Sequence, residues 1–347
     1  MKNIRSFIED VGWPRILIAL FLLSLFILAP FVGVRLDASI NDTLVRFGMN
    51  GVMVLAMVPM VQAGCGLNFG LPLGIIAGLL GAVTSVELQV TGLPGILTAM
   101  LVASPIAIVL GWLYGLLLNK VKGSEMMIAT YVGFSSVAFM CIMWLVLPYH
   151  SPNMVWGYAG KGLRTTISIE AFWQYAISSI GSFRVNEFLS FPTGMFLFFL
   201  LLCFLMSIFM RTRTGTAMTI VGSNPDYARA CGVNIDRMRT LSVILSTWLG
   251  ALGIIMYEQS FGFVQLYMGP FYMAFPAVAA ILIGGASVKK ANIVNVIVGT
   301  ILFQGILTMT PSVINSMIQT DMSEVIRIIV SNGMILYALT RVTKVRS

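Results

Sequence analysis

The side chains most able to do chemistry in this sequence are concentrated in one polar, basic segment, residues 211–239 (RTRTGTAMTIVGSNPDYARACGVNIDRMR). The segment holds five of the 21 Lys and Arg residues, and long apolar runs flank it on both sides. Asp226, Tyr227 and Arg229 place a carboxylate, a phenol and a guanidinium within four consecutive residues, and all three groups form hydrogen bonds readily. The pattern predicts a docking site for a soluble partner, and the alternative is a solvated loop without a partner.

The residues around these three groups predict a short helix. Asn224, or the serine before it, suits the N-cap, and Pro225 suits the first helical position. Asp226 in the first turn complements the helix dipole, and Gly232 is a good stop at the carboxyl end. We therefore expect a helix of about two turns that is parallel to the membrane and exposes the phenol and the guanidinium.

The composition of the rest of the chain predicts a lipid environment. Of the 347 residues, 58% are hydrophobic and 10% are charged, and the mean hydropathy is +0.93. Lipid satisfies no backbone polar group, so the spans must be helices or a closed barrel, and continuous apolar runs of about 20 residues favour helices. We predict an all-α integral membrane protein with about ten transmembrane helices, at residues 14–35, 47–64, 66–86, 93–119, 126–148, 192–210, 240–261, 271–288, 291–310 and 322–340.

The second and third apolar elements are separated by a glycine-rich break, GCGLNFGLPLG at residues 64–74. Glycines and Pro72 interrupt helical continuity there. We expect one of the two elements to be discontinuous or re-entrant. The four-residue spacing of Gly66, Gly70 and Gly74 favours a close approach between helices.

The basic residues divide unevenly between the two ends of the predicted helices. With an even number of spans, 15 Lys and Arg residues lie on the side of both termini and of the 211–239 segment, and five lie on the other side. The positive-inside rule makes the first side cytoplasmic. The 149–191 loop is then the longest outer segment, and its residues 167–180 (ISIEAFWQYAISSI) predict a helix at the outer membrane interface that could seat an external partner.

Polar groups at membrane depth are costly and are therefore candidates for lining a solute pathway. Gln62, Asn68, Glu258 and Gln259 are such groups, and Phe69 could stack on a ring-shaped solute. Each has a structural alternative. Asn68 can be a local cap or turn residue, Glu258 can be an acid at the membrane interface, and Phe69 can be a packing residue.

Several other function classes lack the residues that they need. The sequence has no GxxxxGK[ST] phosphate-binding loop, one histidine, and four cysteines without a CxxC pair, so we expect no bound cofactor and no metal site. The 13 acids are mostly scattered in loops, which favours neither a membrane enzyme nor an ion-coupled carrier, and no stretch resembles a channel filter. The net charge of +8 reflects cytoplasmic loops rather than a nucleic-acid partner.

Two motifs resemble those of ABC importer permeases, specifically the ribose/galactose-type sugar and branched-chain amino acid permease family. The first is the cytoplasmic coupling-loop pattern G-x-N-x-x-A-R-x-x-G-(I/V)-N, which is matched by Gly222, Asn224, Ala228, Arg229, Gly232, Val233 and Asn234. The second is AxxxGG(T/A)S, which is similar to residues 279–287 (AAILIGGAS). The chain departs from the sugar permeases at Asn68, where their GGIDLSVG stretch has an acid, and after GGAS, where Val288-Lys289-Lys290 replaces a glycine.

The resemblance implies a single permease domain over residues 1–347 in a bacterial cytoplasmic (inner) membrane. It implies an ABC ATPase subunit that carries ATP and Mg, a second permease subunit (a second copy or a paralogue), and an extracytoplasmic solute-binding protein as partners within the lipid bilayer. The residues that it assigns to ATPase coupling are Asn224, Asp226, Tyr227, Arg229, Gly232 and Asn234.

The function that we expect from this resemblance is ATP-driven import of a small polar solute, and a sugar comes first among the candidates. Nucleosides, branched-chain amino acids and a furanose signal are the alternatives within the same class. An ion-coupled, stand-alone carrier is the alternative of another class.

Overall fold

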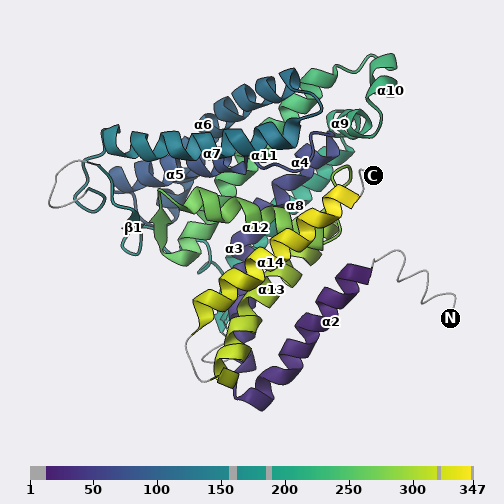
Figure 1. Cartoon of the computed structure of the whole chain (residues 1–347). Coiled ribbons are helices and arrows are strands. Elements are labelled where there is room, and N and C mark those ends of the chain that lie inside the picture. Colours follow the sequence, from purple (N-terminus) through teal and green to yellow (C-terminus); the bar gives the residue numbers. More distant parts are fainter. Residues whose placement is uncertain (1–12, 156–161, 185–189, 319–321, 345–347) are drawn as a thin grey trace, which may run out of the picture.

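The computed structural model describes residues 13–155, 162–184, 190–318 and 322–344, and these residues are mainly helical (Figure 1). Seven helical segments among them are long and apolar enough to cross a membrane. The chain is therefore an all-α integral membrane protein, as its composition predicts. Those seven segments are α2 with the 3-10 turn after it (Trp13–Leu28, Ala29–Val32), α3 with α4 (Leu36–Leu55, Met57–Gln62), α6 (Gly92–Lys120), α7 (Glu125–Val146), α8 (Thr193–Arg211), α11 (Ile235–Phe261) and α13 (Ile293–Ile318).

The other three predicted spans are also helices, but they are shorter or more polar. The helix α5 (Leu71–Glu87) has 17 residues and α12 (Gly269–Ile283) has 15. The helix α14 (Ser323–Lys344) has 22 residues but carries Glu324 and Arg327, which form an ion pair on its surface. Each of the ten predicted elements thus corresponds to a helix or to a helix pair.

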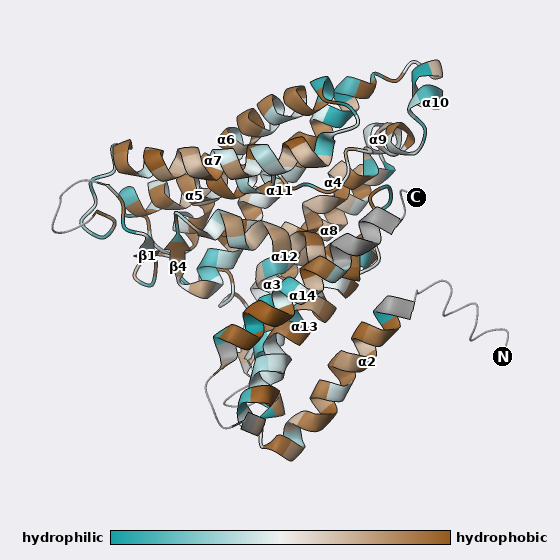
Figure 2. Cartoon of the chain, viewed as in Figure 1, coloured by the Kyte–Doolittle hydropathy of each residue, from teal (hydrophilic) through white to brown (hydrophobic). Residues whose placement is uncertain are grey.

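The centre of the structure is formed by α5, which packs against α6 and α11. Nearly all of α5 is buried, whereas α2, α6 and α7 expose many large apolar side chains, and these helices are mostly brown in Figure 2. Gly74 explains the tight packing, because a Cβ at this position would lie 2.4 Å from the backbone oxygen of Thr247 in α11. The predicted close helix approach at Gly74 is confirmed, since only a glycine fits against the neighbouring backbone.

The predicted break between the second and third apolar elements is confirmed, although it covers residues 63–70 rather than 64–74. Helix α3 is interrupted at Ala56, α4 ends at Gln62, and residues 63–70 run without regular structure before α5 begins. Gly64 and Gly66 adopt positive φ angles of 72° and 79° in this stretch. From here on, the name glycine-rich break refers to residues 63–70. A left-handed backbone is disfavoured for residues with a Cβ, so the glycines permit the turn that two helical segments flank.

The prediction of a helix over residues 167–180 is wrong. Its first residues belong to a short strand, β1 (Thr166–Ser168), which pairs antiparallel with β4 (Phe263–Gln265) after α11. A chain of turns follows, in which Tyr175 has a φ of 55° and donates its backbone N–H to the backbone oxygen of Gln259. Local hydrogen bonds remain in the turns, such as Ser179 N to the backbone oxygen of Tyr175, but pairing with distant backbone keeps them from continuing as a helix, and Trp173 is buried.

The remaining strands of the 149–191 loop are β2 (Phe183–Arg184) and β3 (Ser190–Phe191), which form a two-stranded antiparallel pair. Residues 156–161 and 185–189 of this loop lie outside the described residues. So do three bases near the termini that the topology prediction used, Lys2, Arg5 and Arg346.

The polar segment 211–239 contains more helix than its sequence predicts. After α8, a second short helix α9 (Arg213–Ser223) precedes the expected one, α10 (Pro225–Ala230), and α11 follows. Thr212 is the N-cap of α9, and its side-chain oxygen accepts a hydrogen bond from Gly215 N at 3.2 Å. The segment is therefore a helix–helix unit at one end of the structure, far from β1 (Figure 1).

Candidate functional site

The helix α10 begins and ends where its sequence predicts. Asn224 is the N-cap, and its Oδ1 accepts a hydrogen bond from Tyr227 N at 3.0 Å, with Pro225 at the first position. Gly232 lies beyond the carboxyl end with a φ of 76°, the left-handed conformation that ends helices. Asn234 then caps α11 by accepting from Arg237 N at 2.9 Å. Asn224, Gly232 and Asn234 thus define the shape of the segment.

The exposed face of α10 presents the three groups that were predicted for docking. Tyr227 is 59% exposed, and the side chains of Asp226 and Arg229 are 92% and 70% exposed. Asp226 and Arg229 form an ion pair of 3.2 Å, but a pair this exposed adds little stability and leaves both groups available to a partner. A hydrogen bond with Cys231 raises the pKa of Tyr227, and a tyrosine hydroxyl is in any case protonated near neutral pH and able to donate.

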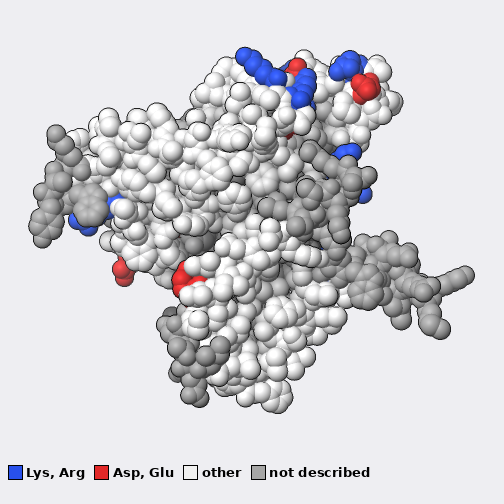
Figure 3. All heavy atoms as spheres, viewed as in Figure 1, with Lys and Arg blue, Asp and Glu red and all other residues white. Residues whose placement is uncertain are grey.

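Charged side chains gather around this helix. Figure 3 shows Lys and Arg over α10 and over the adjoining ends of α6 and α7, whereas the broad surface of the helices beyond is uncharged. Lys122, in the turn between α6 and α7, pairs with Asp236 in the first turn of α11 at 2.6 Å. The α10 surface is therefore polar and faces the solvent, which suits contact with a soluble protein.

The end of α9 touches the glycine-rich break directly. A Cβ placed on Gly222 would lie 2.1 Å from the backbone oxygen of Gln62 and 2.7 Å from Gly64 N, and a Cβ on Gly64 would lie 2.9 Å from Gly222 Cα. The two backbones are thus in contact with no side chain between them. A displacement of α9 and α10 would therefore displace the break as well, because close-packed groups transmit movement.

The turn that follows the second motif contacts the end of α4, directly before the break. Gln62 donates its side-chain Nε2 to the backbone oxygen of Ala291, at 2.5 Å, in the turn between α12 and α13. That turn is held by Asn295, which donates to the backbone oxygen of Gly284 at 2.8 Å, and by Gly285, whose φ is 87°. The coupling-loop motif and the turn after the second motif, which lie far apart in the sequence, therefore both contact residues 62–64.

Asn68 lies in the break as predicted, but it is completely buried. Its Nδ2 donates to Ser246 Oγ at 2.7 Å, and its Oδ1 accepts from the hydroxyl of Tyr114 at 3.3 Å. Ser246 Oγ in turn donates to the backbone oxygen of Ala56 at 2.6 Å, where α3 is interrupted. Asn68 thus ties the break to α6 and α11, and an amide serves here because it both donates and accepts.

Phe69, the next residue, is half-buried and belongs to a group of aromatic rings. Its ring centroid lies 6.1 Å from that of Phe275 in α12. Phe275 lies 6.0 Å from Phe134 in α7, and Phe134 stacks on Phe271 at 4.7 Å. These four phenylalanines, the Phe69 cluster, come from three separate elements. Phe134 is 38% exposed, so the cluster is reachable from outside the core.

Glu258 and Gln259 are both buried near the end of α11, but they differ in their partners. Gln259 accepts from Ile177 N at 3.2 Å and donates to Ser178 Oγ at 2.7 Å, so its amide fixes the turns after β1. Glu258 is 1% exposed, and neither of its carboxylate oxygens has a hydrogen-bond partner among the described residues. An acid buried without a partner is costly, which keeps Glu258 a candidate for the pathway.

The sequence did not predict one ion pair, which joins Arg239 to Glu125. Arg239, the last base of the 211–239 segment, is not a water-facing residue. It is 9% exposed, and its guanidinium donates to Glu125 at the start of α7 at 2.5 Å. No local pattern predicts this pair, because its members are 114 positions apart. Its Nε atom is buried and has no hydrogen-bond partner among the described residues.

No three His, Cys, Asp or Glu side chains in the described part of the chain lie where they could hold a metal ion.

Comparison with known proteins supplies the family. Residues 39–338 match the model of the family described as "Branched-chain amino acid transport system / permease component".

Two relatives are ABC-type or amino acid permeases. The nucleoside ABC transporter permease protein NupB of Lactococcus lactis subsp. cremoris (strain MG1363) is 22% identical over 297 residues, which cover 83% of this chain and 76% of that protein. The tyrosine transport system permease protein of Clostridioides difficile (strain R20291) is 27% identical over 144 residues, 40% of this chain and about half (48%) of that protein.

No solved structure matches the chain. The family model covers most of the sequence, including the break, the Phe69 cluster and both motifs. The chain therefore belongs to the branched-chain amino acid transport system permease family and is an ABC-type transport permease.

Proposed function

We propose that this chain is the permease subunit of an ATP-driven importer in a bacterial cytoplasmic membrane, with both termini and α10 on the cytoplasmic side. ATP and Mg would bind to a separate ABC ATPase subunit. A second permease subunit, either another copy or a paralogue, and an extracytoplasmic solute-binding protein would complete the assembly. The single observation that carries this proposal is the backbone contact between Gly222, beside the exposed helix α10, and Gly64 in the glycine-rich break.

The contact supports a specific order of events. The ATPase subunit would dock on Asp226, Tyr227 and Arg229, which are exposed and lightly constrained. Closure of the ATPase would move α9 and α10 together, and Gly222 would push on Gly64 because nothing compressible lies between them. The break carries Asn68 and Phe69 at its far end, so the movement would reach membrane depth.

The experiment is purification of the tagged chain from the membranes of its own organism, followed by measurement of Mg-dependent ATPase activity in the eluate. We expect activity to co-purify with the natural chain and to be lost with the triple variant Asp226→Ala, Tyr227→Ala, Arg229→Ala. Glu170→Gln is the control, because Glu170 is exposed on the opposite loop. Full activity with the triple variant would refute docking on α10.

The solute is proposed to be small and polar, and a sugar is the first class that the motifs suggest. The Phe69 cluster favours a second candidate, a nucleoside, because a planar base can stack on phenylalanine rings. The relative NupB is named as a nucleoside permease, whereas the other relative is named for tyrosine, which also carries a ring. Branched-chain amino acids and a furanose signal remain candidates with no ring-stacking requirement.

Uptake of radiolabelled ribose, uridine, leucine and tyrosine by cells with and without the chain separates these candidates. If the solute has an aromatic ring, Phe275→Leu should reduce its uptake about tenfold. A stacked aromatic pair contributes about 1 kcal/mol beyond the burial of its apolar surface, and the variant loses part of that burial as well. Phe191→Leu is the matched control, because Phe191 stacks with Phe183 and Phe196, away from this cluster. Equal uptake by both variants would contradict ring stacking and leave the sugar, the branched-chain amino acids and the furanose signal as candidates.

A further inference from the structure

A cavity of about 180 Å³ lies behind α10, on the side that faces the helix bundle. Four elements enclose it: the end of α9 with α10, the glycine-rich break, the turn between α6 and α7, and the start of α11. Liquid water occupies about 30 Å³ per molecule, so the space admits several waters or one small polyatomic ion. The lining residues are Ala63, Gly64, Lys122, Val221, Gly222, Pro225, Arg229, Ile235 and Arg239.

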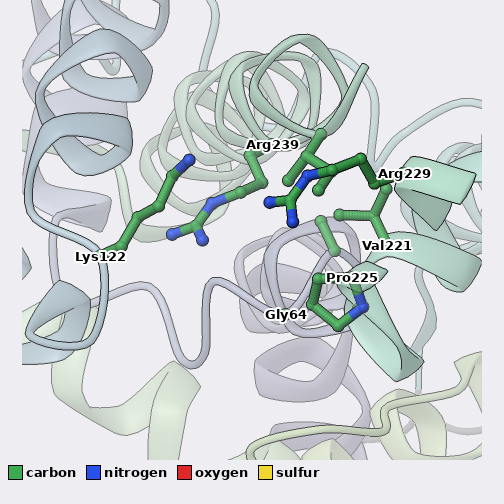
Figure 4. Close-up of a pocket in the computed structure, with 9 residues that line it drawn as sticks. Gly64, Lys122, Val221, Pro225, Arg229 and Arg239 are labelled. Carbon is green, nitrogen blue, oxygen red and sulfur yellow. The ribbon is translucent and has the colours of Figure 1, made fainter. Parts of the chain in front are cut away.

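The charge of this lining is one-sided. Three of the nine residues are bases, and none is an acid. Figure 4 shows Lys122, Arg239 and Arg229 side by side, with Arg239 in the middle and the guanidinium of Arg229 pointing toward it. Each base comes from a different element, so the fold rather than a local run of sequence brings the three charges together.

The bases differ in how firmly they are held. Arg239 is buried and bound to Glu125, but its Nε atom is buried without a hydrogen-bond partner in the described structure. Lys122 and Arg229 pair with Asp236 and Asp226, and both of these pairs are largely exposed. Exposed pairs contribute little stability, so Lys122 and Arg229 can turn to a ligand while Arg239 stays in place.

We propose that this cavity is an anion site that takes a tetrahedral oxyanion of the phosphate class. Several donors around a compact space match an ion that accepts hydrogen bonds on all of its oxygens, and guanidinium groups bind phosphate with two parallel bonds. An anion held there bridges Arg229 on α10 to Arg239 on α11 and therefore fixes α10 against the bundle. Free phosphate and the phosphate of an anionic lipid headgroup share this chemistry.

The test is equilibrium binding of radiolabelled inorganic phosphate to the full chain purified in a neutral detergent. We expect saturable binding to one site. Lys122→Gln and Arg229→Gln should each weaken it about tenfold, the loss expected from one charge-assisted hydrogen bond. Arg237→Gln is the control, because Arg237 is exposed in the same segment but does not line the cavity. Arg239 is left unchanged, since its removal would leave the half-buried Glu125 without its ion-pair partner.

Nanodiscs of phosphatidylcholine, with and without phosphatidylglycerol, distinguish the two sources. If the headgroup fills the site, phosphatidylglycerol will weaken phosphate binding, and if free phosphate is the ligand, binding will be unchanged. Absence of saturable phosphate binding in detergent and in phosphatidylcholine nanodiscs would overturn the proposal, and so would an equal loss of affinity in Arg237→Gln. No ATPase subunit is present in this experiment, so its result is independent of the proposed coupling function.

Discussion

Gly222 and Gly64 lie so close that a Cβ on Gly64 would be 2.9 Å from Gly222 Cα, and one on Gly222 would be 2.1 Å from the backbone oxygen of Gln62. Gly222 lies in the last turn of α9, the helix before α10, and Gly64 lies in the glycine-rich break. The polar segment and the interrupted helix therefore form one mechanical unit.

The first prediction concerns this contact. Gly222→Ala should destabilise the protein by about 1–3 kcal/mol and should lower uptake further than ATPase activity, because the added methyl group forces the two backbones apart. Thermal unfolding in detergent and uptake by cells measure the two effects. Gly333→Ala is the control, since a Cβ at Gly333 meets no atom within 4 Å. Normal stability and uptake in Gly222→Ala would contradict a rigid contact.

The second prediction concerns Asn68. Asn68→Ala should destabilise the protein by about 1–3 kcal/mol, because Tyr114 and Ser246 would each lose a buried hydrogen bond. Asn68→Asp should cost at least as much, since it places a charge in a fully buried position. Melting temperatures in detergent provide the measurement. The exposed Asn153→Ala should change stability by no more than about 0.5 kcal/mol.

The third prediction separates two carboxylates. Glu258→Gln should not lower the melting temperature, because the carboxyl group has no hydrogen-bond partner to lose in the described structure, and it should lower uptake if the acid serves the pathway. Glu87→Gln should instead lower the melting temperature, because Glu87 accepts hydrogen bonds from the backbone N–H groups of His150 and Ser151. A fall in stability for Glu258→Gln would reveal an unrecognised partner.

The fourth prediction concerns the turns after β1. Gln259→Ala should destabilise the protein by about 1–3 kcal/mol and should speed amide hydrogen exchange over residues 169–181, because Ile177 and Ser178 would lose the side chain that binds them. Ser179→Ala, an exposed change in the same turns, should leave exchange in the neighbouring residues unaltered. Mass spectrometry of the exchanged protein gives the readout. Unchanged protection in Gln259→Ala would rule out this anchoring role.

Local chemistry explains what could be predicted from the residues of the candidate site. Asn224, Pro225 and Gly232 act on their own helix within a few positions, so their capping roles follow from residue type and spacing. The exposure of Tyr227 follows from the same helix. The break was predictable in part. Its glycines permit the left-handed turn at 63–70, whereas Pro72 does not interrupt a helix but lies in the first turn of α5, where proline is tolerated.

Longer-range pairing explains the predictions that failed or were missing. The predicted helix at 167–180 is replaced by strand pairing with residues 263–265 and by hydrogen bonds to Gln259. Arg239 belongs to a polar segment, but it is buried because it pairs with Glu125. In both cases the partner lies more than 80 positions away, and residue type alone does not reveal it.

The sequence by itself determined the lipid environment, the places of the ten apolar helical elements and the position of α10, but not the additional helix α9. Apolar length and backbone hydrogen bonding leave a chain in lipid few other structures, and capping is local. The tertiary structure alone decided which polar groups are satisfied and which backbones touch. Asn68 finds Ser246, Gly222 meets Gly64, and three bases gather around one cavity because the helices pack in one particular arrangement. Those contacts depend on packing between distant segments, which no local pattern encodes.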